Sequence, residues 1–271
     1  MKKTIRAILV FAVASLMLAS CKEDPTPPVA GFTVSNEAPV QWDQVTITST
    51  ATGADETTYA VTGGTFEMID DVTVQFLEAK TYTITQMVTN ADGTVEASQD
   101  VTVTEPDNTY TFDDTEYTIG TEDAPNAYWW EQLIYDEEFN PIGSFNYIRM
   151  LGDVDGQDNP NLLKLYPMAG PNALQATYTW SDSGDIGTYD AGVTAGYAGF
   201  SWDWTTIGNS GGDLVIELVY ADATDSNNNV YDITLASYTL NYGNYDQNFS
   251  FVSEGTKDFS VSYRGVIDPI E

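Results

Sequence analysis

The chain has 271 residues and is strongly acidic, with 41 Asp and Glu residues against nine Lys and Arg residues and a formal net charge of −32 at pH 7. Proteins bind nucleic acids by neutralising phosphates with Lys and Arg, so we expect no nucleic-acid partner. The sequence contains no histidine and a single cysteine. This composition excludes Ser-His and Cys-His nucleophiles, zinc sites built from His and Cys, and any disulfide within the chain.

Residues 1–20 have the features of a secretory signal peptide. Three basic residues stand among the first six, and the uncharged run Ala7–Ala19 that follows is too short to span a bilayer. The run leads into Leu18-Ala19-Ser20-Cys21, which resembles the lipobox of bacterial lipoproteins. The resemblance implies cleavage before Cys21 and stable anchoring by acyl chains on that residue. The alternative is an ordinary signal peptide followed by an incidental cysteine.

Residues 21–28 are predicted to be the lipidated cysteine and a tether. Lys22-Glu23-Asp24 resembles the short signal that directs lipoproteins of Bacteroidetes to the outside of the outer membrane. The alternative is three solvated charges at a chain end. Pro25-Thr26-Pro27-Pro28 favours a stiff, extended spacer. We therefore expect the protein to be lipid-anchored in the outer membrane and to face the cell exterior.

Residues 29–104 are predicted to form an antiparallel β-sandwich, because apolar residues alternate with Thr and Gln between turns rich in glycine. The alternating apolar sets are Val45 and Ile47; Val72, Val74 and Phe76; and Tyr82, Ile84 and Val88.

The same segment resembles a PKD domain, which is an immunoglobulin-like sandwich. The matching residues are Ala30-Gly31-Phe32, Lys80-Thr81-Tyr82-Thr83-Ile84, Asn90-Ala91-Asp92-Gly93 and Val101-Thr102-Val103. The Trp-x-Phe-Gly-Asp-Gly signature of the family is missing, and the stretch from Tyr59 to Phe66 stands in its place. The resemblance implies a spacer.

Residues 105–109 are a polar linker, and residues 110–271 are predicted to form a larger, aromatic-rich β-sandwich or jelly-roll domain. The whole chain is therefore expected to be all-β. The strand-like stretches of the second domain are Ala127–Tyr135, Phe145–Leu151, Ala173–Trp180, Gly199–Thr205, Leu214–Tyr220, Val230–Leu240 and Phe259–Tyr263.

Part of this domain resembles one that is common in Bacteroidetes lipoproteins. The matching stretches are Tyr178–Trp180, Gly187–Asp190, Gly212–Ile216 and Tyr231–Leu235. Such lipoproteins are encoded beside polysaccharide-import systems of the starch-utilisation (Sus) type. The resemblance implies an accessory surface protein that binds glycans and works with an outer-membrane transporter.

Tryptophan suits this role, because sugars stack their C–H faces on aromatic rings while carboxylates and amides bind the hydroxyl groups. Adjacent strand residues point to opposite faces, so Trp129 and Trp130 cannot both lie in one core. Trp129 shares its face with Glu131, which prefers water, and we expect Trp129 to be the exposed ring. Leu133 on the same face favours the opposite assignment.

Trp202 and Trp204 are the second candidate pair, with Asp203 between them as a partner for sugar hydroxyls. The two rings share a strand face with Phe200. This stripe is either part of the core or, on a concave sheet, a platform for a glycan.

A third candidate is a calcium site formed by Asp153, Asp155 and Asp158, since clustered carboxylates are ligands that calcium prefers. The spacing differs from an EF-hand, whose twelfth position would here be Lys164. A solvated Asp-rich turn is the alternative.

No catalytic residues can be assigned, and we expect the protein not to be an enzyme. The Glu-x-Asp-x-x-Glu strand of retaining β-glucanases is missing, and its nearest approach, Glu67–Asp71, has the wrong spacing in the wrong domain. The sequence therefore predicts a surface lipoprotein that captures a neutral glycan, such as the β-glucan laminarin, for a Sus-type uptake system. The alternatives are a glycoside hydrolase with an unrecognised carboxylate pair and a structural or adhesive surface protein.

Overall fold

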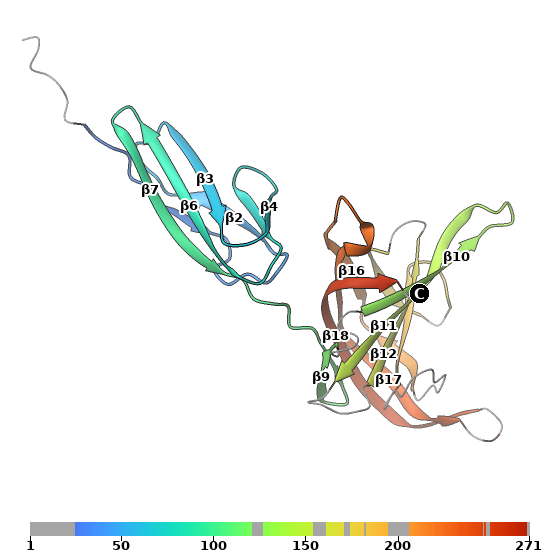
Figure 1. Cartoon of the computed structure of the whole chain (residues 1–271). Helices are drawn as coiled ribbons and strands as arrows, with labels where there is room; N and C mark the ends of the chain where they lie inside the picture. Colours follow the sequence, from blue (N-terminus) through green and yellow to red (C-terminus); the bar gives the residue numbers. More distant parts are fainter. Residues whose placement is uncertain are drawn as a thin grey trace, which may run out of the picture. The chain divides into compact units, whose positions relative to one another are not determined.

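The computed structural model describes residues 25–120, 127–153, 161–170, 174–181, 183–194, 206–245, 247 and 250–269. The regular structure of these residues consists of β-strands and one short 3-10 helix, η1 (Ser226–Asn228), which confirms the prediction of an all-β protein. Within the described residues, no helix is long and apolar enough to cross a membrane. The chain divides into two compact units, Met1–Thr104 and Glu105–Glu271 (Figure 1).

The first unit is a sandwich of two antiparallel sheets, with strand orders β1-β2-β5-β4 and β3-β6-β7. This is the architecture that the alternating sequence predicts. The strands are β1 (Phe32–Val34), β2 (Gln44–Ser49), β3 (Glu56–Thr62), β4 (Phe66–Met68), β5 (Thr73–Phe76), β6 (Thr81–Asn90) and β7 (Gly93–Thr102).

The alternating apolar residues form the core of the first unit. Val45, Val74, Phe76, Tyr82 and Ile84 are fully buried, because every second side chain of a strand faces the opposite sheet. The rings of Phe76 and Tyr82 lie 4.5 Å apart at their centroids.

A buried amide also joins the two sheets of the first unit. Gln86 of β6 is fully buried, and its Oε1 accepts a hydrogen bond of 2.7 Å from the backbone N–H of Gly31. Its Nε2 donates to the Ser49 hydroxyl at 2.9 Å and to the Tyr59 hydroxyl at 3.2 Å. Buried polar groups are stable where their hydrogen bonds are satisfied, and Gln86 makes three.

In the described residues, the second unit is built from one sheet of eleven strands. They are β8 (Thr109–Phe112), β9 (Thr115–Ile119), β10 (Ala127–Tyr135), β11 (Pro141–Asp153), β12 (Asn161–Ala169), β13 (Ala176–Trp180), β14 (Thr188–Thr194), β15 (Thr206–Gly211), β16 (Leu214–Tyr220), β17 (Val230–Tyr245) and β18 (Phe251–Pro269).

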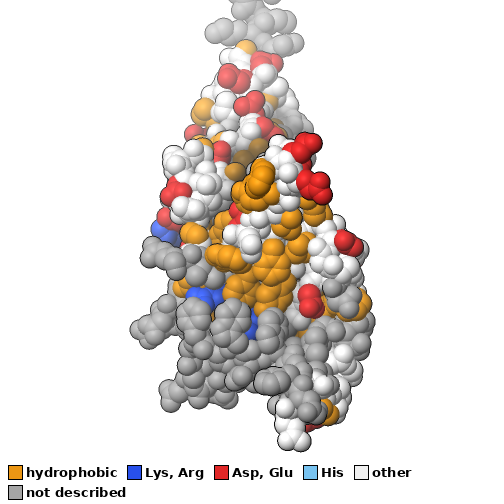
Figure 2. Space-filling model, turned by 90° about the vertical axis from the view of Figure 1, so that its right-hand side faces the viewer, with side chains coloured by type: hydrophobic (Ala, Val, Ile, Leu, Met, Phe, Trp, Pro, Cys, Tyr) orange, Lys and Arg blue, Asp and Glu red, His pale blue; other side chains and the backbone are white. Residues whose placement is uncertain are grey.

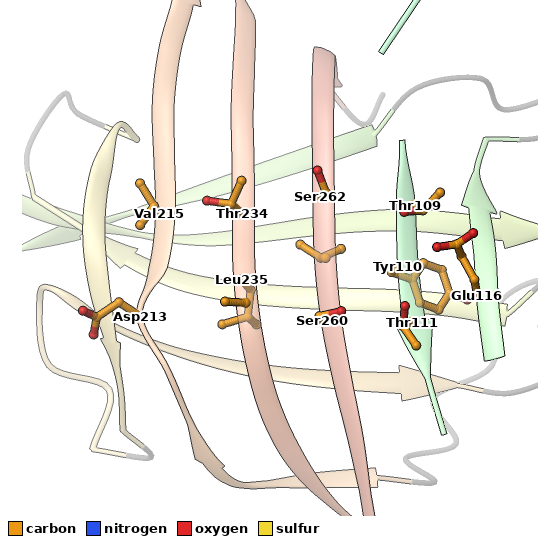
Figure 3. Close-up of a pocket in the computed structure, with 12 residues that line it drawn as sticks. Thr109, Tyr110, Thr111, Glu116, Asp213, Val215, Thr234, Leu235, Ser260 and Ser262 are labelled. Carbon is orange, nitrogen blue, oxygen red and sulfur yellow. The ribbon is translucent and has the colours of Figure 1, made fainter. Parts of the chain in front are cut away.

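This sheet closes on itself. Backbone pairing runs from β8 through β9, β11, β12, β14, β13, β16 and β17 to β18, which pairs with β8 again. In addition, β10 pairs with both β11 and β18, and β15 pairs with β17. The sheet therefore folds over a single core, as the two layers of a sandwich do. Figure 3 shows the strands that carry Val215, Thr234 and Ser262 side by side, with other strands running crosswise behind them.

The core of the second unit is rich in tyrosine. Tyr110, Tyr178, Tyr189, Tyr238 and Tyr263 are almost fully buried, and a buried hydroxyl needs a hydrogen-bond partner. Tyr178 donates to the Leu174 carbonyl, Tyr189 to the Gly212 carbonyl, Tyr238 to the Asp190 carboxylate and Tyr263 to the Val266 carbonyl. Burial raises the pKa of Tyr178 and of Tyr263 to about 12.

Candidate functional site

The outer face of β10, β11 and β12 carries a group of aromatic side chains. Four of them contact one another, and we call these four the aromatic face: Trp130, Phe145, Tyr147 and Tyr166. They come together because alternate residues of paired strands share one side of a sheet. Trp130 lies opposite Tyr147 in the register of β10 and β11, and Phe145 lies opposite Met168 in the register of β11 and β12.

The rings of the aromatic face contact one another in a continuous series. The centroids of Trp130 and Phe145 are 6.5 Å apart with an edge-to-face angle of 72°. Phe145 stacks on Tyr166 at 5.8 Å, and Tyr166 stacks on Tyr147 at 5.3 Å with an angle of 14° between the rings. Aromatic pairs of this geometry are favourable beyond the area that they bury. The series therefore forms a pre-ordered apolar surface.

This surface is open to solvent at Trp130, which is 44% exposed, while the other three rings are partly exposed. Figure 2 looks at the side of the molecule on which β10 lies in Figure 1. It shows hydrophobic side chains gathered into one area, with basic side chains at its lower left and acidic side chains at its right. Burial, together with the neighbouring Tyr147 and Asp190, raises the pKa of Tyr166. Its hydroxyl therefore stays protonated at neutral pH.

Trp129 lies on the other face of β10, and the expectation that it is the exposed member of the pair is wrong. It is opposite Ile148, which is fully buried, and its ring packs against the core of the second unit. Glu131 and Leu133, on the same face, are exposed. They lie farther along the hairpin, where the core no longer covers that face.

The hairpin that joins β10 to β11 carries further exposed apolar side chains. Tyr135 is 51% exposed, Ile142 41% and Phe139, near the tip, 85%. Phe139 has a φ of 63°, which is unusual for a bulky residue. The Asp136 carboxylate holds this tip by accepting hydrogen bonds from the backbone N–H groups of Glu138 and Asn140.

Two basic side chains lie beside the aromatic rings. In the paired registers, Arg149 of β11 is opposite Tyr128 of β10 and Lys164 of β12. The Arg149 guanidinium carbon is 5.1 Å from the centroid of the Tyr128 ring, which is a cation–π contact. Lys164 is 5% exposed. The site therefore carries positive charge in a chain of strongly negative net charge.

Apart from the aromatic face, the second unit has a hollow of about 480 Å³, which crosses the outer faces of β16, β17, β18, β8 and β9. Its floor consists of short side chains, and Asp213 and Glu116 lie at its opposite ends (Figure 3). Among the described lining residues the one aromatic residue is Tyr110, which is 1% exposed. In the part of the chain that the structure describes, this hollow offers hydroxyl groups for hydrogen bonding but no exposed ring on which a sugar could stack. Six of the short side chains are Thr109, Thr111, Val215, Thr234, Ser260 and Ser262.

Several predicted site residues lie outside the described residues, so the structure does not test them. These are Cys21, Asp155, Asp158, Trp202, Asp203 and Trp204. Asp153 is the last residue of β11, and its side chain is not described. Among the residues that are described, no group of three or more His, Cys, Asp or Glu side chains could hold a metal ion.

Four carboxyl groups of the described residues have a pKa below the usual range, and hydrogen bonds in turns or loops cause the change. They are Asp70, Glu78, Asp136 and Asp222. The general acid of a glycoside hydrolase needs the opposite change, a raised pKa. These four groups are therefore ionised acceptors that shape their turns.

Three of the four rings, Phe145, Tyr147 and Tyr166, are absent from the sequence-based prediction, which rests on pairs of tryptophans. Phe145, Tyr147 and Arg149 alternate with Asn146 and Ile148, and this pattern places three chemically useful side chains on one face. Tyr166 gave a weaker signal, since it follows the largely apolar run Leu162–Leu165.

Comparisons with protein-family models, with curated proteins and with solved structures found no match to this chain.

Proposed function

We propose that this chain is a lipid-anchored surface protein that binds a polysaccharide on the aromatic face of its second unit. In this proposal it passes the glycan to an outer-membrane transporter of the Sus type. The observation that carries the proposal is the exposure of Trp130 at the open end of a series of contacting rings on β10, β11 and β12.

The chemistry of carbohydrate recognition supports this role. Sugar rings present apolar C–H faces that stack on aromatic side chains, and an exposed apolar patch on a protein surface marks an interaction site. Gln132 lies on the same face as Trp130, opposite Phe145 in register, and Asp190 lies opposite Tyr166. Their amide and carboxylate groups suit the sugar hydroxyls that surround a stacked ring.

The anchor and the cellular location rest on the sequence alone. The lipobox-like residues before Cys21 and the Lys22-Glu23-Asp24 segment after it support attachment to the outer leaflet of the outer membrane. The first unit would then act as a spacer between the membrane and the binding unit. The negative net charge favours a neutral ligand, such as a β-glucan of the laminarin type.

Affinity electrophoresis tests the proposal. The purified chain should migrate more slowly in a native gel that contains a suitable polysaccharide, and an array of immobilised glycans should show which polymer it retains. Release of reducing ends from a retained glycan would instead favour the glycoside hydrolase. Absence of retention on every glycan would contradict the proposal and favour a structural or adhesive role.

A further inference from the structure

The basic residues of this chain are few, and most of those described are paired with carboxylates. Lys80 lies 2.6 Å from Glu78, Lys257 is paired with Asp113, and Arg264 makes two charge-assisted hydrogen bonds to Asp232 at 2.6 and 2.7 Å. Pairing is expected where acids outnumber bases by 41 to nine.

Arg149 departs from this pattern. Among the residues that the structure describes, it makes no salt bridge and no hydrogen bond, and its Nε atom is buried without a partner. Its described contact is the cation–π contact with Tyr128. A buried polar group without a hydrogen bond is unfavourable, and native structures contain few of them. An Arg of this kind is therefore a candidate for binding a ligand.

The position of Arg149 relates it to the aromatic face. It lies two residues beyond Tyr147 on the same side of β11, a distance of roughly 7 Å along a strand. A sugar stacked near Trp130 and Tyr147 would therefore bring a substituent, or its neighbouring sugar, to the guanidinium. On the other side of the rings, the Asp190 carboxylate accepts a hydrogen bond from Tyr238 at 2.9 Å and lies opposite Tyr166 in register.

The chemistry of arginine selects the kind of substituent. A guanidinium group is planar, always charged, and matched to the two oxygens of a carboxylate or a sulfate. A guanidinium that lies against an aromatic ring keeps N–H groups at its edge for such an anion. Lys164 lies opposite Arg149 in register, on the same side of the sheet.

We propose that the ligand of the aromatic face is an acidic glycan, whose carboxylate or sulfate group is bound by Arg149 while its sugar ring stacks near Trp130. This inference rests on the proposed function and revises the neutral ligand that net charge alone favours. The charge of the whole chain governs long-range approach, whereas the groups at the site govern recognition.

Matched polymers test the inference directly. A neutral β-1,3-glucan and the same glucan oxidised at C6 to a polyglucuronate differ in the carboxylate and share the backbone. Polygalacturonate and its methyl ester form a second pair, and a glucan with its sulfated derivative tests the sulfate. We expect the chain to bind at least one acidic member about tenfold more tightly than its neutral partner, with a preference that weakens as salt increases.

Variants of Arg149 test whether this residue causes the preference for acidic polymers. Arg149→Gln should remove most of the difference between acidic and neutral polymers, and Arg149→Lys should keep part of it, since a charge remains without the planar fork. Lys257→Gln removes the same charge from β18 and should leave the preference intact. Circular dichroism and thermal melting confirm that each variant is folded.

The outcomes distinguish a failure of the acidic ligand from a failure of glycan binding itself. Tighter binding of neutral polymers, equal binding within every pair, or an unchanged preference in Arg149→Gln would overturn the acidic ligand while leaving glycan binding in place. Absence of binding to every polymer would overturn both.

Discussion

Trp129 and Trp130 are adjacent in the chain but lie on opposite faces of β10, so that Trp129 packs on the core while Trp130 is 44% exposed. The two residues have the same chemistry and belong to the same strand. They differ in environment alone, and they therefore form a matched pair for separating binding from stability.

We expect Trp130→Ala to weaken glycan binding about tenfold, which corresponds to a loss of about 1.4 kcal/mol, with little change in the free energy of unfolding. Trp129→Ala should instead lower the free energy of unfolding by roughly 2–4 kcal/mol, because it removes a ring that packs on the core. Affinity electrophoresis on the retained glycan measures the first effect, and denaturant unfolding measures the second.

If the folded Trp130→Ala variant kept its full retention on the glycan, the sugar would not stack on Trp130. A large loss of stability in Trp130→Ala would show that this ring belongs to the core.

Gln86 provides a prediction for the first unit. Replacing Gln86 with Leu removes three hydrogen bonds and leaves the N–H of Gly31 unpaired, which should lower the free energy of unfolding by about 1–3 kcal/mol. The Gly31 amide should also exchange its hydrogen faster. Gln44→Leu is the control, because Gln44 is an exposed glutamine of β2. Equal losses in the two variants would mean that the buried hydrogen bonds contribute nothing of their own.

Periodicity predicted much of the strand pattern. The bounds Ala127–Tyr135 and Leu214–Tyr220 agree with β10 and β16. By contrast, β12 was missed, because Leu163, Lys164 and Leu165 are all buried and the alternation of apolar and polar residues disappears. The hairpin of β8 and β9 was also missed. Its turn uses Asp113 and Asp114 with φ of 53° and 59°, where glycine or asparagine is more usual.

The aromatic face could not be derived from the sequence, since it depends on long-range register. Only the pairing of β10 with β11 places Trp130 opposite Tyr147, and only the pairing of β11 with β12 adds Tyr166. The assignment of the two tryptophans failed for a related reason. Glu131 is exposed because it lies farther along the hairpin, whereas Trp129, two residues earlier, packs against the core.

Calcium binding near the end of β11 remains a prediction. If Asp153, Asp155 and Asp158 bind calcium in the native state, then millimolar calcium should raise the melting temperature relative to a chelator. The stabilisation would be about 1.4 kcal/mol when the free ion is at ten times the dissociation constant. Asp155→Asn should reduce the effect, while Asp225→Asn, in the loop after β16, should not. Identical melting in calcium and chelator would rule out the site.

The lipid anchor is tested at Cys21. Cells that express the wild-type chain should incorporate a fatty-acid analogue into it, whereas Cys21→Ser should give an unlabelled or unprocessed precursor. Protease added to intact cells should degrade the wild-type protein if it faces the exterior. Equal labelling of the two chains would contradict lipidation, and full protection from protease would place the protein inside the envelope.

The loop between β16 and β17 gives a prediction about pH. The Asp222 carboxylate accepts hydrogen bonds from the Thr224 hydroxyl at 2.6 Å, the Thr224 backbone N–H at 2.7 Å and the Asp225 backbone N–H at 3.2 Å. These bonds, with the Thr224 hydroxyl as the largest cause, lower the pKa of Asp222 to about 2. Because the pKa is lower in the folded than in the unfolded chain, the ionised carboxylate stabilises the folded loop.

This stabilisation should be complete above the ordinary Asp pKa near 4 and should be lost as the pH falls through about 2. Thr224→Val removes the hydroxyl donor while keeping the shape of the side chain, so the pKa of Asp222 should rise toward its ordinary value. Thr234→Val, on β17, is the control and should leave that pKa unchanged. Carbon NMR of the Asp222 carboxyl group follows the titration in each chain. An Asp222 pKa near 4 in the wild type, or one that Thr224→Val does not raise, would contradict the role of these hydrogen bonds.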